Sequence, residues 1–264
     1  MNIKNPTIVT ALFDIGRDTW DSYNLSYGSY LHWMRSLLMY DNQMVIFTDE
    51  KLLDEIKKNR LVADPRLEKT IFVVSDVSNI DAYKMYYDRI KEIMESSEFQ
   101  TKKQFNVPEM TKPLYNVVIF NKIFYIKECI QKNYFNSDFY IWMDAGVLRN
   151  DINEVVLNWP NLNKINEKYF DKITFFSHEV PVPYIEPHMH LVSQYRFIHG
   201  GSFFVPNNGC ILEFINDFTY LVEKYLNEGY VGSEEKYYDF CYLKNPNNYN
   251  IVKSDWRQYF NIFS

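Results

Sequence analysis

The sequence is poor in the residues that build disulfide frameworks and cysteine metal sites. Only three cysteines occur among 264 residues, Cys129, Cys210 and Cys241, and no pair has the C-x-x-C spacing. An odd count without that spacing argues against a disulfide scaffold and favours buried thiols in a reducing compartment.

Long hydrophobic runs are also missing. No stretch approaches the ~20 apolar residues that a membrane span requires. The first residues, MNIKNPTIVTALFDIG, lack the basic start, the long apolar run and the cleavage site of a signal peptide. We therefore expect a cytoplasmic protein without a transmembrane segment, for which peripheral docking on a membrane surface stays open.

Basic stretches do not dominate the chain, whose formal net charge is -6. Nucleic acid is therefore not expected as the main partner, because it selects a clustered cationic face. The P-loop, G-x-G-x-x-G, G-x-S-x-G and H-E-x-x-H motifs are absent as well. Aromatic residues are abundant instead, at 18 %, and supply rings that can line a cleft for sugars or bases, although drift in composition is the favoured explanation.

Short apolar runs alternate with helical periodicity in the first half of the chain. Strands are predicted at 6–16, 43–50 and 69–76, and helices at 27–38, 50–60, 80–97 and 114–133. A loop broken by prolines is expected at 98–113. This alternation predicts an α/β fold with a mainly parallel, Rossmann-like sheet flanked by helices.

The second half of the chain is less regular. Strands are predicted at 137–144, 172–177 and 201–206, a Pro-rich loop at 181–187 and a long helix at 208–227. No composition shift or linker separates the two halves, so a single domain over residues 1–264 is expected.

Aspartates follow several of the predicted strands. Ligands of open α/β sheets bind beyond the carboxyl ends of the strands, where Asp14, Asp49, Asp76 and Asp144 are placed. Asp49 and Asp76 precede helical or turn segments and are interpreted as caps. Asp144 is different, because Ala and Gly follow it and a capping role is less convincing.

Six stretches, in order along the chain, carry a resemblance to a known family. They are TIVTALFDIGR (7–17), MVIFTDE (44–50), YNVVIFNKIF (115–124), FYIWMDAGVLR (139–149), HGGSFFVP (199–206) and GSEEKYYDF (232–240). Together they are similar to the HtrL/YibB family, also called WlaTC/HtrL, of GT-A-like glycosyltransferases. The resemblance implies a GT-A-like domain with a nucleotide-sugar-binding half at about 1–150 and an acceptor-side half at about 151–264.

The resemblance also implies a nucleotide-sugar donor, with UDP the favoured nucleotide, and a glycan acceptor. Asp144 lies where such enzymes hold an Asp-X-Asp motif for Mn²⁺ or Mg²⁺, but the second acid is replaced by Gly146. Two readings stay open: a metal site with one carboxylate, completed by water and phosphate oxygens, or a metal-independent enzyme that relies on Lys122 and Arg17.

Donor-binding residues follow from the same resemblance. Thr10, Leu12 and Asp14 would hold the base and ribose. Arg17 would reach the phosphates through its fork of donors, although an ordinary surface arginine fits the pattern equally. Beside the isoleucine stripe of the predicted helix, Asn116 and Lys122 would face the donor. Lys122 could extend from the edge of the core toward a diphosphate, although a solvated surface lysine fits the pattern equally.

Three further motifs are candidates for chemistry. Gly200 and Gly201 precede a predicted strand and would let the backbone approach the donor sugar, with His199 beside them as a metal ligand or acceptor contact. His188 and His190 would share one face of an extended segment, a weak metal pair without a third ligand.

The stretch GSEEKYYDF predicts a helix start with Ser233 as its N-cap. Glu234 there is either a first-turn acid favoured by the helix dipole or the general base that deprotonates the acceptor.

The sequence thus predicts a glycosyltransferase that moves a sugar from a nucleoside diphosphate sugar to a growing surface glycan, with Glu234 and Asp144 as catalytic residues. The alternative is a non-catalytic nucleotide- or carbohydrate-binding protein on the same fold.

Overall fold

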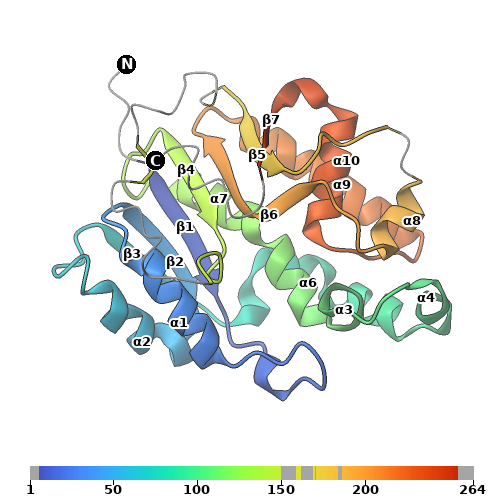
Figure 1. The fold of residues 1–264 in the computed structure, drawn as a ribbon, viewed down its shortest axis with the longest axis horizontal. Coiled ribbons are helices and arrows are strands. Elements are labelled where there is room, and N and C mark those ends of the chain that lie inside the picture. The colour runs from blue at the N-terminus through green and yellow to red at the C-terminus, as the bar shows by residue number, and fades with distance from the viewer. Residues whose placement is uncertain (1–5, 150–158, 162–168, 170, 184–185, 255–264) are drawn as a thin grey trace.

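The computed structural model describes residues 6–149, 159–161, 169, 171–183 and 186–254 (Figure 1). Within these residues one seven-stranded sheet has the order β3-β2-β1-β4-β6-β5-β7. Its strands are β1 (Thr7–Leu12), β2 (Gln43–Thr48), β3 (Thr70–Val74), β4 (Phe139–Met143), β5 (Ile173–Ser177), β6 (Ile198–Pro206) and β7 (Tyr249–Lys253). Among them β6 alone runs antiparallel to its neighbours, β4 and β5, so the predicted mainly parallel α/β sheet is confirmed.

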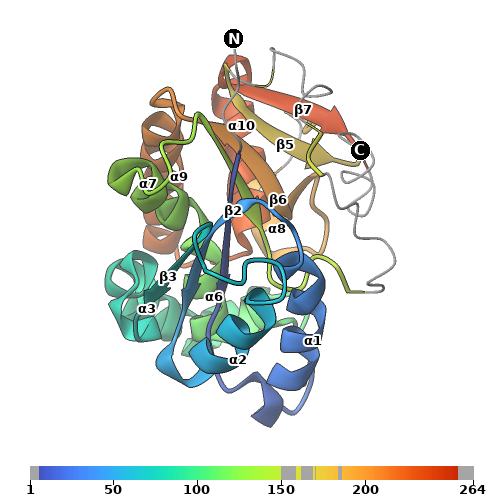
Figure 2. The same cartoon turned by 90° about the vertical axis from the view of Figure 1, so that its left-hand side faces the viewer.

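Helices cover both faces of the sheet. The helices of the first half are α1 (Tyr27–Leu38), α2 (Glu50–Arg60), α3 (Asp81–Glu95), α4 (Ser97–Lys102), α5 (Pro108–Thr111), α6 (Pro113–Phe120) and α7 (Lys122–Lys132). Those of the second half are α8 (Pro187–Val192), α9 (Cys210–Asn227) and α10 (Glu234–Lys244). Figure 2 shows α3, α7 and α9 on one side of the sheet and α1 on the other.

Two hydrophobic cores follow from the alternation of side chains along the strands. In β1, Ile8 and Leu12 pack with residues of α1 and α2, whereas Val9 joins the larger cluster beneath α3, α6, α7 and α9. Successive side chains of a strand point to opposite faces, so a strand covered by helices on both sides is apolar throughout. The continuous apolar runs of the sequence are therefore explained.

Side-chain caps confirm three of the predicted element starts. The Ser26 hydroxyl accepts a hydrogen bond from the Ser29 amide at 3.1 Å, which begins α1. Asp49 accepts from the Leu52 amide at 3.0 Å at the start of α2. Asp76 caps the turn after β3 by accepting from the Ser78 amide at 2.8 Å. Each carboxylate or hydroxyl satisfies an amide that the helix leaves unpaired.

Prolines caused the main errors in the predicted elements. The segment 98–113, predicted as a loop, contains α4 and α5, and Pro108 and Pro113 are first residues of α5 and α6. Pro187 likewise begins α8 at the end of the predicted loop 181–187. A proline at the first helical position loses no hydrogen bond and already has the helical φ, so it begins a helix as readily as it ends one.

The strand order places a crevice at one point of the sheet edge. From β1 the chain continues to β2 and β3 on one side, while β4 and the later strands lie on the other. The strand order therefore reverses its direction between β1 and β4, as it does in the 3-2-1-4 part of Rossmann-like sheets. Such a reversal leaves a crevice beyond the carboxyl ends of these two strands. The segments after β1 and β4 are therefore expected to form a binding site.

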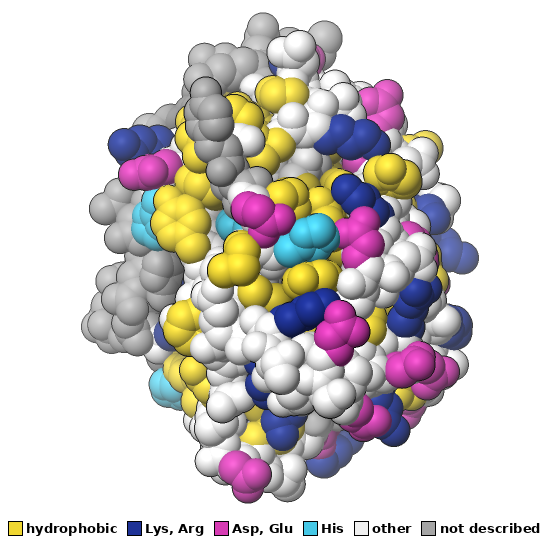
Figure 3. Space-filling model, turned by 90° about the vertical axis from the view of Figure 1, so that its right-hand side faces the viewer, with side chains coloured by type: hydrophobic (Ala, Val, Ile, Leu, Met, Phe, Trp, Pro, Cys, Tyr) yellow, Lys and Arg dark blue, Asp and Glu magenta, His cyan; other side chains and the backbone are white. Residues whose placement is uncertain are grey.

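Within the described residues no helix combines the length and the apolar character that crossing a membrane requires. On the face shown in Figure 3, acidic, basic and histidine side chains are interspersed with hydrophobic ones.

A wholly buried arginine joins several elements near the amino ends of β2 and β3, whereas the crevice lies beyond the carboxyl ends of β1 and β4. Arg60, the last residue of α2, donates to the carbonyl oxygens of Leu38, Tyr40 and Asn42 at 2.8, 2.5 and 2.8 Å. Its Nε donates to the Thr70 hydroxyl at 2.8 Å. The guanidinium thus supplies partners to carbonyls that would otherwise be buried and unpaired.

Replacing Arg60 by Met should therefore destabilise the fold strongly. Each buried carbonyl left without a donor costs about 1–3 kcal/mol, so the loss should exceed roughly 3 kcal/mol. The control is Arg35→Met in α1, which removes only an exposed ion pair with Glu55 and should cost less than about 1 kcal/mol. Urea unfolding measures both, and similar losses for the two variants would contradict the role given to Arg60.

Candidate functional site

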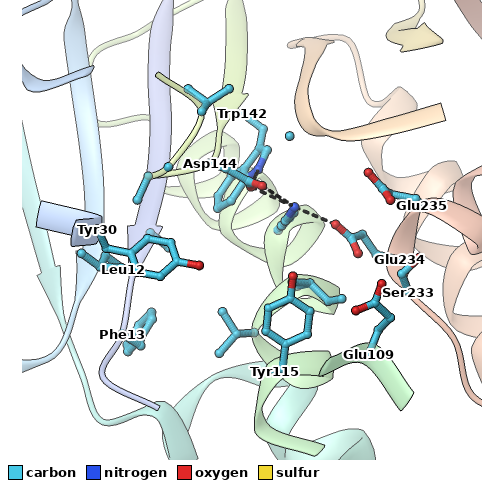
Figure 4. Close-up of a pocket in the computed structure, with 18 of the residues that line it drawn as sticks. Leu12, Phe13, Tyr30, Glu109, Tyr115, Trp142, Asp144, Ser233, Glu234 and Glu235 are labelled. Carbon is cyan, nitrogen blue, oxygen red and sulfur yellow. Dashed lines mark hydrogen bonds and ion pairs between the residues drawn. The ribbon is translucent and has the colours of Figure 1, made fainter. Parts of the chain in front are cut away.

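A cavity of about 340 Å³ lies at the crevice between the ends of β1 and β4. Leu12 and Phe13 line it at the end of β1, Asp144 directly after β4, and Glu234 from α10 (Figure 4). It therefore joins parts of the chain that the sequence keeps far apart, at the edge where the fold predicts a ligand.

Lys122 lies at the centre of the charged residues of the cavity. Its Nζ is 2.8 Å from Oδ1 and 3.1 Å from Oδ2 of Asp144, 2.6 Å from Oε1 of Glu234 and 3.0 Å from the carbonyl oxygen of Gly200. Figure 4 shows the carboxylates of Asp144 and Glu234 pointing toward each other, and the dashed lines between them mark the ion pairs that both form with Lys122. An ammonium has three N–H donors, so these partners engage all of them.

The two carboxylates keep this lysine charged although only 4 % of it is exposed. Burial alone lowers the pKa of Lys122, but the charges of Asp144 and Glu234 outweigh burial and the net pKa is raised. A buried charge persists only when paired and hydrogen-bonded, and here it is both.

Asp144 is held by its own strand as well. The indole N–H of Trp142 donates to Oδ1 of Asp144 at 2.8 Å, because residues two apart in a strand point to the same face. The backbone amide of Asp144 donates to the carbonyl of Gly201 in β6 at 2.9 Å. Both contacts fix the carboxylate at the strand end.

Glu234 and Glu235 are the first residues of α10 and lie at the cavity wall, where Glu234 is buried and Glu235 is partly buried. Burial raises the pKa of Glu234 to about 7, against the opposing effect of Lys122 and with further raising by Glu235 and Asp144. Glu235 accepts from the Gly200 amide at 2.9 Å and pairs with Arg196 at 3.1 Å. Glu234 thus has the pKa that suits a general base at neutral pH.

Gly200 makes the approach of α10 to β6 possible. The structure places both glycines inside β6, not before it as predicted, opposite the irregular pairing with β5. A Cβ on Gly200 would lie 2.5 Å from Oε1 of Glu234 and 2.9 Å from Cγ of Glu235. At Gly201 a Cβ would meet only Oδ2 of Asp144, at an ordinary 3.8 Å.

On the opposite wall Arg17 lies among aromatic rings. Its guanidinium carbon is 5.3, 5.3 and 5.4 Å from the ring centroids of Trp20, Tyr30 and Tyr115. Its Nε donates to the Tyr23 carbonyl at 3.2 Å, and Nη1 donates to the Tyr30 hydroxyl. Packing against the rings orients the guanidinium at the cavity.

A second arginine continues this wall. Arg149 lies with its guanidinium carbon 5.1 Å from the Trp33 centroid and its Nε 3.1 Å from the Gly146 carbonyl. The rings of Trp33 and Tyr30 meet edge to face at 5.2 Å. Arg17 and Arg149 therefore flank one pair of rings on α1.

Most of the residues predicted for the site do line the cavity. They are Leu12, Arg17, Lys122, Asp144, His199, Gly201 and Glu234. Two assigned roles change. Lys122 is neither a surface lysine nor free to contact a diphosphate. Ser233, which also lines the cavity, occupies the N-cap position of α10 without a side-chain cap hydrogen bond.

Four predicted donor-binding residues are not among the residues that line the cavity. Thr10 is wholly buried in β1. Gly200 lies behind Glu234 and meets the site through its carbonyl. Asn116 donates to the carbonyls of Glu109 and Gly232 at 3.0 and 3.3 Å, and so joins α5 and α6 to the turn before α10.

Asp14 is engaged by its own loop. Its carboxylate pairs with Lys51 and accepts from the Gly16 amide at 3.0 Å, while its amide donates to Asp49 at 2.6 Å. These hydrogen bonds stabilise the turn after β1, so the presence of an aspartate at position 14 is explained without a bound ligand.

The two histidines predicted as a metal pair are on α8 and have separate partners. His188 lies between Glu186 and Glu228 at 3.1 and 2.6 Å, whereas buried His190 is 2.9 Å from Asp239. Residues two apart on a helix do not share a face, so the extended segment that a metal pair would require is not present.

Sequence reasoning missed several residues that line the cavity. They are Glu109, Tyr115, Trp142, Arg149, His178, Arg196 and Glu235. A signal existed for Trp142, which precedes Asp144 by two positions in a strand. For the others, the proximity depends on contacts between distant segments.

The residues present do not fit a divalent cation at Asp144. The described residues contain no group of three or more His, Cys, Asp or Glu side chains that could hold a metal ion. Both oxygens of Asp144 already lie within 3.1 Å of the Lys122 ammonium. Two unit charges 4 Å apart repel by about 4 kcal/mol at an effective dielectric constant near 20, and a divalent ion doubles this.

Comparison with known proteins places the chain in a bacterial family. The family model described as "Bacterial protein of unknown function (HtrL_YibB)" matches residues 4–264, so the chain belongs to the HtrL_YibB family. Protein HtrL of Escherichia coli (strain K12) is 23 % identical over 278 residues, which cover 98 % of this chain and 92 % of that protein. The family predicted from the sequence is confirmed.

Two solved glycosyltransferase structures also resemble the chain, each at 10 % sequence identity. The glycosyltransferase GlyE of Streptococcus pneumoniae TIGR4 has a TM-score of 0.45; the match covers 96 % of this chain but 46 % of that one. The galactosyltransferase LgtC, in complex with donor and acceptor sugar analogs, has a TM-score of 0.44 and coverages of 93 % and 73 %. The chain thus spans about half the length of GlyE.

Gly200→Ala should destabilise the protein, because its methyl group would displace the Glu234 carboxylate that Lys122 holds. Overpacking of this kind costs about 1–3 kcal/mol. Gly201→Ala is the matched control, which should change the free energy of unfolding by less than about 1 kcal/mol. Thermal unfolding of both variants checks this, and equal losses would show that the approach of Glu234 to Gly200 is unimportant.

Proposed function

We propose that the protein is a glycosyltransferase that moves a sugar from a nucleoside diphosphate sugar, with UDP the favoured nucleotide, to a glycan acceptor. One observation carries this proposal: the cavity at the switch point of the sheet has Arg17 and Arg149 beside the rings of α1 on one wall, and Asp144 and Glu234 around Lys122 on the other. The arginines suit an anionic leaving group, and the carboxylates suit hydroxyl groups of a sugar.

The donor end of the cavity combines apolar and cationic surfaces. Leu12 and Phe13, at the end of β1, line it beside Tyr30 and offer surfaces for a base and ribose. Arg17 and Arg149 flank the same rings and would stabilise charge that develops on the departing diphosphate.

The acceptor end is formed by the start of α10 and by α5. Figure 4 shows Ser233, Glu109 and Tyr115 together at this end. The Ser233 hydroxyl is buried and has no hydrogen-bond partner within the described residues. A sugar hydroxyl in this place would supply the partner that Ser233 lacks.

Glu234 is the base in the proposed reaction. The acceptor oxygen forms a bond to the anomeric carbon as the bond from that carbon to the diphosphate breaks. The acceptor proton passes to Glu234, and the diphosphate leaves with the bonding electron pair. Asp144 and Lys122 position Glu234 through the ion pairs described above. We further propose that this reaction extends a surface glycan from the cytoplasmic side.

A screen of nucleotide sugars by thermal shift tests the donor. A ligand at 100 times its Kd stabilises the native state by about 2.7 kcal/mol, which should raise the Tm by about 5–10 °C for a chain near this size. No shift with any uridine, guanosine, adenosine or cytidine sugar nucleotide would refute the proposal. A shift without donor hydrolysis or transfer would favour the alternative, a non-catalytic binding protein.

Glu234→Gln should lower kcat by about 10²–10⁴-fold while donor affinity hardly changes. Because the base acts when deprotonated and the pKa of Glu234 is about 7, the wild-type rate should rise with pH through about 7. The rate of the variant should not show this rise with pH.

Glu95→Gln, at the exposed end of α3, is the control and should keep both turnover and profile. Near-normal turnover of Glu234→Gln would show that Glu234 is only a first-turn acid of α10.

A further inference from the structure

We infer that the proposed transfer works without a divalent cation. The Lys122 ammonium occupies the place between Asp144 and Glu234 that such an ion would take. Arg17 and Arg149, which lie on the opposite wall, bind the diphosphate. This inference rests on the proposed function and assigns Arg149 to the site.

The first support is the charge arrangement around Lys122. Its three donors are directed to Asp144, Glu234 and the Gly200 carbonyl. A lysine engaged in this way is a fixed internal cation that neutralises the carboxylates. A diphosphate must therefore find other donors.

The second support is the position that the missing acid would occupy. Gly146 stands two residues after Asp144, and a Cβ there would lie 3.4 Å from the rings of both Trp33 and Tyr30 and 3.6 Å from Nε of Arg149. These are ordinary van der Waals distances for a Cβ, so two rings and an arginine border the position of the second acid. At this place the cavity thus offers aromatic rings and an arginine, which suits an anion, in place of a second carboxylate for a metal.

The third support is the state of Arg17. A guanidinium has five N–H donors, and within the described residues two of them have partners, the Tyr23 carbonyl and the Tyr30 hydroxyl. Three aromatic rings surround it, so its orientation is set before a ligand arrives. Such an arginine is suited to bidentate contact with a phosphate.

The decisive experiment compares UDP binding to the wild-type protein by calorimetry in EDTA, in Mn²⁺ and in Mg²⁺, with GDP and ADP in parallel. We expect the same affinity in all three conditions. Affinity that appears only with a metal overturns the inference and leaves the proposed function intact. Failure of all three nucleotides in every condition refutes the proposed function itself.

Variants of the two arginines test the diphosphate contact in EDTA. Arg17→Gln and Arg149→Gln should each weaken UDP by about 10–100-fold, the effect of losing a charge-assisted contact, and leave uridine unchanged. The control is Arg35→Gln, which changes an exposed arginine on α1 that forms an ion pair with Glu55. This variant should bind UDP normally. Equal losses for uridine and UDP, or no loss, would overturn the assignment of these arginines.

Lys122→Ala tests whether the lysine ammonium occupies the position that a divalent metal ion would take. The folded variant leaves Asp144 and Glu234 facing each other without a cation, so Mn²⁺ alone should bind it and raise its Tm, whereas wild type should show neither effect. A folded variant that neither binds Mn²⁺ nor gains Tm from it would overturn the inference that Lys122 replaces a divalent ion. If the variant does not fold, the wild-type comparison of EDTA with Mn²⁺ still decides.

Discussion

The buried ammonium of Lys122 is the contact on which the architecture of the site depends. It joins the start of α7, the end of β4, the middle of β6 and the first turn of α10. Removing either carboxylate would leave a buried charge with incomplete compensation, and breaking such a pair costs far more than an exposed one. The four segments are therefore coupled: a change in one moves the groups held by the others.

Close packing around this ammonium explains one of the small residues nearby. Gly200 lets Glu234 and Glu235 approach the backbone of β6, whereas a Cβ at Gly146 would meet the rings of Tyr30 and Trp33 at an ordinary 3.4 Å. Neither glycine has a positive φ. Gly200 is therefore needed for the space that a side chain would fill rather than for an unusual backbone conformation.

The sequence predicts the sheet well and the site in part, for one physical reason. Strand and helix periodicity is local, so the alternation in the first half defined the fold, and the aspartate after β4 identified the sheet edge. The contact between Lys122 and Glu234 joins residues 112 positions apart, and nothing in the local pattern encodes it. The sequence therefore identified both residues but not that they pair.

The predicted helix 114–133 shows how tertiary contacts act on local patterns. Its periodicity is continuous, yet the structure ends α6 at Phe120 and begins α7 at Lys122. Between them the Asn121 side chain accepts a hydrogen bond from the Ala82 amide at the start of α3, at 2.8 Å. The break thus coincides with a contact to a distant helix, immediately before the lysine that organises the site.

The two ends of the cavity differ in their charge. Around Lys122, the acids Asp144, Glu234 and Glu235 face the cations Lys122 and Arg196. When Glu234 is ionised this group carries one net negative charge, and it is neutral when Glu234 holds a proton. An anionic leaving group is therefore not attracted to this end, and the field favours the wall of Arg17 and Arg149. A proton taken up by Glu234 during transfer would also reduce repulsion of the newly formed diphosphate, so base catalysis and stabilisation of the leaving group would support each other.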